Sequence, residues 1–91
     1  MWARVARFDG DPADVDRRIA AVQGAVDDLP AEMEGARVLL LIDRESGGAL
    51  GVALFETQEA LRRGDERMSQ GSGHGGTRTG VEFYEVAVHN L

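Results

Sequence analysis

The chain has 91 residues and a net charge of −6, from 10 basic and 16 acidic side chains, and it contains neither Lys nor Cys. The acidic balance disfavours nucleic acids and anionic membranes as partners, while the missing Cys and Lys exclude thiolate metal sites, cysteine nucleophiles and Schiff-base chemistry. The length predicts one domain over residues 1–91 whose small core would be supplemented by dimerisation.

The first predicted element is a strand over residues 2–8, in which bulky and charged side chains alternate. A helix is then predicted from Asp11 onward, because Asp11 can accept hydrogen bonds from free N–H groups and Pro12 suits the first helical position. The apolar stripe of this helix consists of Val15, Ile19, Val22, Val26 and Leu29. Pro30 ends the helix.

A β-hairpin is predicted next, with strands over residues 36–42 and 49–55 and a turn over 43–48. The run from Val38 to Ile42 is apolar without interruption. Such a run is typical of a strand that is buried on both faces, and we interpret it as a dimer interface in which Leu40 takes part. In the second strand the small residues Gly51 and Ala53 alternate with larger ones, which predicts one recessed face.

A second helix is predicted from the N-cap Thr57 to about Met68, with Ala60, Leu61 and Met68 facing inward. Residues 70–80 contain five glycines and are predicted to form a loop. The last predicted strand covers residues 81–89.

The element order is therefore β-α-β-β-α-β, the split βαβ arrangement. We predict an α+β domain in which a four-stranded antiparallel sheet carries both helices on one face and leaves its other face apolar. There is no signal-peptide pattern at the amino terminus, and the longest apolar run is too short to span a bilayer. A cytoplasmic protein is the default expectation.

The Gly-rich segment 71–76 has the spacing of a dinucleotide-binding fingerprint, but a helix precedes it and a strand follows it, which is the wrong context. His74 lies in this segment. It is either a general base on a lid over a ligand or a solvated loop histidine. The other histidine, His89, is far away in sequence, and no metal site is predicted.

Other candidate site residues have two interpretations each. Phe8 and Phe55 are core residues or ligand contacts, with Phe55 placed beside the recess at Gly51, and inward-facing Met68 is a further candidate ligand contact. The Tyr84 hydroxyl binds the backbone or a ligand. Arg4 pairs across the sheet with Glu82 or Glu85, or it holds an acidic ligand.

Three stretches resemble one family: residues 3–10, the turn region 41–51, and Phe55-Glu56-Thr57-Gln58-Glu59-Ala60-Leu61, which is similar to the family's aromatic-Glu-Ser/Thr-x-Glu-Ala-Leu motif at the start of the second helix. Through them the whole chain resembles the dimeric α/β-barrel superfamily, near its antibiotic-biosynthesis-monooxygenase-like group. The resemblance implies a ferredoxin-like fold, a homodimer with sheets packed face to face, and a pocket between sheet and helices.

The resemblance also implies a function that needs no cofactor. The first expectation is an oxygenase, cyclase or isomerase for a small aromatic or polyketide-like compound, with His74 or Tyr84 moving a proton and Arg4, Phe8, Gly51, Phe55 and Met68 contacting the ligand. The alternative is a homodimer that binds a small hydrophobic or aromatic molecule, or assists another protein, without catalysis. Haem degradation is not expected, because the Asn that such relatives carry in the first strand is absent.

Overall fold

The computed structural model describes residues 1–70 and 76–91. The strands are β1 (Trp2–Asp9), β2 (Arg37–Ile42), β3 (Ala49–Phe55) and β4 (Thr77–Glu85), and the helices are α1 (Val15–Asp27) and α2 (Gln58–Ser69). Two short 3-10 helices, η1 (Pro12–Asp14) and η2 (Ala31–Met33), flank α1. The chain is an α+β domain with the element order that the sequence predicts.

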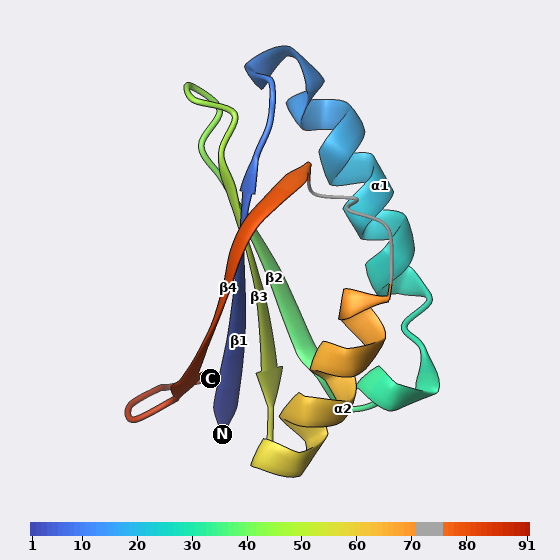
Figure 1. Ribbon diagram of the computed structural model, residues 1–91, viewed down its shortest axis with the longest axis vertical. Coiled ribbons are helices and arrows are strands. Elements are labelled where there is room, and N and C mark those ends of the chain that lie inside the picture. The colour runs from blue at the N-terminus through green and yellow to red at the C-terminus, as the bar shows by residue number, and fades with distance from the viewer. Residues whose placement is uncertain (71–75) are drawn as a thin grey trace.

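The four strands form one antiparallel sheet in the order β2-β3-β1-β4. This order is compatible with a ferredoxin-like fold. Figure 1 shows both helices on the same side of the sheet, so that neither covers its other side, called here the open face. Strands β2 and β4 are the two edges, and the amino-terminal strand β1 lies inside the sheet.

The helix starts follow the predicted capping chemistry. The Asp11 side chain accepts a hydrogen bond from the Ala13 N–H at 2.9 Å, and η1 then leads into α1. The Thr57 hydroxyl accepts one from the Ala60 N–H at 3.0 Å, as expected for the N-cap of α2.

The core lies between α2, η2 and the helix-facing side of the sheet. Its buried centre consists of Met33, Ala53, Phe55 and Leu61. Gly64 in α2 lies directly over the Phe55 ring, because a Cβ at this position would collide with two ring carbons. A glycine that weakens the helix in isolation is therefore the residue that lets α2 approach the sheet.

The predicted last strand is displaced along the chain. Strand β4 already begins at Thr77, so residues 77–80 belong to the sheet rather than to the predicted loop, and residues 86–89 lie outside the strand. The reason is the extent of β1, whose register pairs Asp9 with Thr77 and Trp2 with Glu85. Beyond Trp2 little of β1 remains to pair with.

Leu40 does not lie on the open face. Strand β2 alternates between half-buried Val38, Leu40 and Ile42, which line a groove beneath α1, and exposed Arg37, Leu39 and Leu41 on the opposite side. The expectation that Leu40 takes part in a face-to-face contact is therefore wrong.

In the described ranges, 1–70 and 76–91, no helix is long and apolar enough to cross a membrane.

Candidate functional site

The open face is an apolar surface with a charged margin. The strand register gives its residues in rows, and each row contains one residue from each of β2, β3, β1 and β4, in that order. One row is Leu41, Leu50, Arg7 and Gly80, the next is Leu39, Val52, Val5 and Glu82, and the third is Arg37, Leu54, Ala3 and Tyr84. Leu39 and Leu41 on this face are 48% and 50% exposed.

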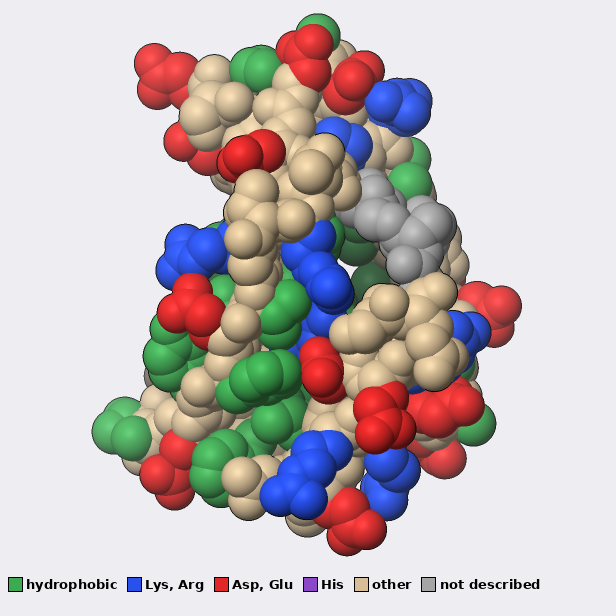
Figure 2. Space-filling view, viewed as in Figure 1, with side chains coloured by type: hydrophobic (Ala, Val, Ile, Leu, Met, Phe, Trp, Pro, Cys, Tyr) green, Lys and Arg blue, Asp and Glu red, His purple; other side chains and the backbone are tan. Residues whose placement is uncertain are grey.

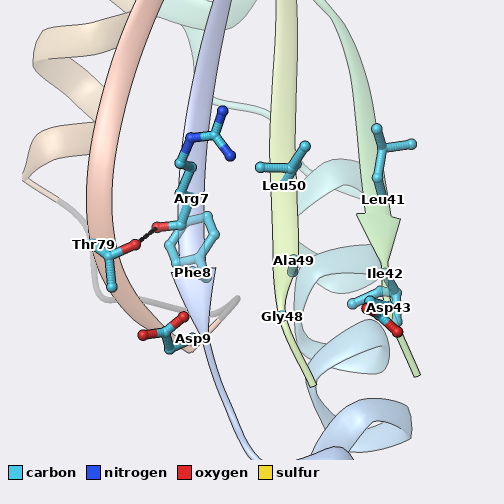
Figure 3. Close-up of a pocket in the computed structure, with 10 residues that line it drawn as sticks. All are labelled: Arg7, Phe8, Asp9, Leu41, Ile42, Asp43, Gly48, Ala49, Leu50 and Thr79. Atoms are coloured by element: carbon cyan, nitrogen blue, oxygen red, sulfur yellow. Dashed lines mark hydrogen bonds between the residues drawn. The ribbon is translucent and has the colours of Figure 1, made fainter. Parts of the chain in front are cut away.

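A cavity of about 410 Å³ lies at the end of this face beside the β2–β3 turn. Figure 3 shows Arg7, Leu50 and Leu41 side by side on three strands, with Asp9 and Asp43 toward the turn. The Thr79 hydroxyl lies at its β4 side and donates to the Arg7 carbonyl oxygen at 3.4 Å. The cavity therefore combines an apolar floor with a few polar groups at its rim.

Arg7, Glu82 and Tyr84 form a hydrogen-bonded network at the margin of the open face. The Arg7 Nε donates to Glu82 Oε1 at 2.7 Å, and the Tyr84 hydroxyl donates to Glu82 Oε2. These bonds, first that from Tyr84 and then that from Arg7, hold the pKa of Glu82 below its ordinary value. The bond to Glu82 raises the pKa of Tyr84. Both shifts move the pKa values farther from 7. At pH 7 such groups are better suited to ligand binding than to proton transfer.

Arg4 lies on the other side of the sheet, facing the helices. Its side chain is buried, and its Nε donates to Asp65 Oδ1 in α2 at 2.8 Å. Its Nη1 lies 3.5 Å from the Met68 sulfur, so two of the candidate ligand contacts do lie together. The predicted pairing of Arg4 with Glu82 or Glu85 is wrong, because Arg4 pairs with Asp65 instead, and Glu82, opposite Val5, lies on the other face of the sheet.

The remaining candidates are scattered. Phe55 is sealed in the core beneath α2. Phe8 lies with its ring about 3.4 Å from where a Cβ of Gly51 would be, so that the predicted recess at Gly51 is filled by this ring. Phe8 also lines the cavity of the open face. Arg4, Gly51, Phe55 and Met68 lie outside it, and Tyr84 lies two residues along β4 from Glu82.

His74 lies outside the described residues, so the structure does not place it. Within residues 1–70 and 76–91, no group of three His, Asp or Glu side chains could hold a metal ion.

Sequence reasoning missed Arg18, which is only 5% exposed although it lies in α1. Its Nη1 donates to the Gly47 carbonyl oxygen, and a Cβ on Gly10 would collide with its guanidinium. Gly76 also lies against it. Figure 2 shows basic side chains between β4 and α2, with apolar side chains beside them on the β4 side. Two features could have indicated that Arg18 is buried. It lies beside the apolar stripe of the helix, and glycines at the ends of the strands leave room for its side chain.

No protein-family model matches the chain. Two curated relatives are similar to it: the uncharacterized protein MT2635 and the uncharacterized protein Rv2558, from the Mycobacterium tuberculosis strains CDC 1551 / Oshkosh and ATCC 25618 / H37Rv. Each is 36% identical over 70 residues, which are 76% of this chain and 30% of the relative. The chain thus spans less than a third of the length of the curated relatives it matches. Their names state no activity.

Proposed function

We propose that this chain is a homodimeric domain of the dimeric α/β-barrel type, near the antibiotic-biosynthesis-monooxygenase-like group, that binds a small apolar or aromatic molecule between the open faces of two sheets. The element order and the strand order β2-β3-β1-β4 are compatible with the ferredoxin-like fold on which such dimers are built. The observation that carries the proposal is the apolar open face with a cavity at its end.

Because the open face is apolar, covering it with a second copy of the chain is energetically favourable. Leu39 and Leu41 are about half exposed, and Leu50, Val52 and Val5 continue the apolar surface across the sheet. Full burial of a Leu or Val side chain contributes about 1.5–3 kcal/mol, so completing the burial of the two leucines alone is worth about 2 kcal/mol. A monomeric domain rarely exposes such a contiguous surface without a binding role.

The cavity suits a small ligand. Its volume of about 410 Å³ is within the usual range for small-molecule sites, about 300–1,000 Å³, and an opposing sheet would close its open side. Leu41 and Leu50 would contact an apolar ring system. Because Arg7 already pairs with Glu82 through Nε, its remaining guanidinium N–H groups would take one polar oxygen of the ligand.

Catalysis is the second candidate function. The Tyr84 hydroxyl is held by Glu82 at the margin of the same face, where it would orient a substrate oxygen in a cofactor-free oxygenase, cyclase or isomerase. If the ligand is identified and turned over, Tyr84→Phe and His74→Ala test this candidate. Full turnover in both variants would exclude the two residues as its proton-transfer groups.

Native mass spectrometry tests the proposed dimer. We expect the unchanged protein to be at least a dimer, with additional small-molecule mass in freshly purified samples. Val52→Glu places a carboxylate in the middle of the open face and should remove the face-to-face association. The matched control is Val88→Glu, since Val88 is 90% exposed and outside the sheet. A folded Val52→Glu protein that associates as strongly as the Val88→Glu control would contradict the face-to-face arrangement.

A further inference from the structure

Strand β2 is an unpaired edge. It pairs with β3 on one side, and within the described residues no strand lies on its other side. Natural edge strands usually carry a Lys, a Pro, a bulge or a covering loop that prevents pairing with another chain. Between Val38 and Ile42 this strand has none of the protective residue types, and its register with β3 is regular.

An apolar groove of about 250 Å³ runs along this edge, between α1 and β2. Ile19, Val22 and Val26 line its helix side, and Val38, Leu40 and Ile42 line its strand side. One polar residue, Gln23, also lines the groove, and its side-chain amide donates to Asp27 at 2.9 Å. A strand added at this edge could therefore form hydrogen bonds with the backbone of β2 and place every second side chain in the groove.

The charges at the two ends of β2 are complementary to each other. Arg37 begins the strand, is exposed, and forms no ion pair with any residue in the ranges 1–70 and 76–91. Asp43 follows the last residue of the strand. Its Oδ1 accepts from the backbone N–H groups of Glu45 and Ser46 at 2.9 and 3.3 Å, which lowers its pKa and keeps it ionised. A strand with a cation at one end and an anion at the other is self-complementary when two copies run antiparallel.

We propose that β2 is a second interface between copies of this chain, in which two β2 strands pair antiparallel around a two-fold axis at Leu40. This register sets Val38 opposite Ile42 of the partner subunit and Arg37 opposite Asp43 of the partner subunit, and the reverse pair follows by symmetry. The two sheets then become one continuous sheet. The interface is separate from the open face, so a protein that uses both surfaces assembles beyond a dimer.

Disulfide trapping tests the register. The chain has no Cys, so Leu40→Cys introduces a single sulfur. Directly opposite residues of an antiparallel pair have Cβ atoms about 4.5–5.5 Å apart, close enough for a disulfide after a small adjustment. We expect a covalent dimer under mild oxidation. Val38→Cys is the matched control, since Val38 lies on the groove side rather than on the open face and is opposite Ile42 of the partner subunit, so that its own copy lies farther away.

The ion pairs give a second readout that does not alter a packed residue. Arg37→Glu sets two carboxylates against each other at both ends of the paired strands, and we expect edge association to weaken about tenfold in sedimentation or native mass spectrometry. The control is Arg62→Glu, an identical charge change at an exposed position of α2. Association that is equally sensitive to both changes, or to neither, would overturn the proposed pairing.

The two interfaces are separable in one experiment. If Val52→Glu removes an association while the Leu40→Cys disulfide still forms, both surfaces are in use. If Val52→Glu removes nothing and the disulfide forms, the face-to-face dimer fails and the edge interface stands. If the disulfide fails to form and Arg37→Glu has no effect, the edge interface is refuted whatever becomes of the open face.

Discussion

Gly64→Ala should destabilise the protein, although alanine is the better helix former. Gly64 is buried in the middle of α2, where its added Cβ would collide with two carbons of the Phe55 ring and lie 3.0 Å from the Met33 sulfur. The Phe55 ring cannot swing aside easily, because its side chain is buried in the core with only 3% of the residue exposed.

The magnitude follows from two opposing terms. Replacing a helical Gly by Ala contributes about 1 kcal/mol of helix stability. Overpacking a filled core costs about 1–3 kcal/mol, and a collision with an aromatic ring favours the upper part of this range. We therefore expect Gly64→Ala to lower the free energy of unfolding by about 1–2 kcal/mol, which lowers Tm by about 4–8 °C per kcal/mol in a domain of this size.

The same chain provides the control. Gly24 is also helical, in the last turn of α1, but nothing lies within 4 Å of where its Cβ would be. Gly24→Ala should raise the free energy of unfolding by about 0.5–1 kcal/mol. Both variants are measured by urea and thermal unfolding, followed by circular dichroism at one fixed protein concentration, because association makes Tm concentration-dependent.

A double-mutant cycle locates the cause. Phe55→Leu shortens the side chain beneath the helix, so Gly64→Ala should cost less in that background than in the unchanged protein, by about 1 kcal/mol or more. If Gly64→Ala stabilises the protein as much as Gly24→Ala, the close packing of α2 on Phe55 is refuted.

Two further predictions concern ionisable groups. Tyr84 is the only tyrosine, so an ultraviolet titration reads it alone; its pKa should lie above the ordinary value and fall in Glu82→Gln. Because the folded-state pKa of Tyr84 is raised, the stability that its hydrogen bond to Glu82 contributes is complete below about pH 10 and is lost as the pH rises through the raised pKa. An ordinary pKa for Tyr84 would refute the network. Asp65→Ala leaves buried Arg4 without its carboxylate and should cost about 3 kcal/mol, against little change for exposed Glu66→Ala. Equal losses of unfolding free energy in the two variants would contradict the buried pair.

Much of the fold could be predicted because its signals are local. The Asp11 and Thr57 caps and the alternation in β1 each depend on a few neighbouring residues, and the structure confirms them. The limits of β4 could not be predicted in this way. They are set by the length of β1, which lies some 70 residues earlier in the chain, and the sequence of residues 77–80 contains no strong strand signal of its own.

The site was harder to predict because it depends on which side of a strand each residue takes. The apolar run of β2 contains no polar residue to mark its faces, so only the position of α1 shows that Leu40 faces the helix and Leu41 the open face. Arg4 and Arg7 also take opposite sides of their strand. Arg4 faces α2 and pairs with Asp65, and Arg7 faces outward and pairs with Glu82.

The interior position of β1 has a consequence for how the chain folds. Strand β1 is made before the other three strands, yet its two neighbours are β3 and β4, and β4 is made last of the four. While the protein is being synthesised, one side of β1 stays without hydrogen-bond partners until about residue 85 has emerged. Contacts between such distant segments slow folding, because the entropy of closing the long loop is lost before the contacts form. We therefore expect the sheet to form in a late and cooperative step, with the amino-terminal strand exposed to other nascent chains until that step is complete.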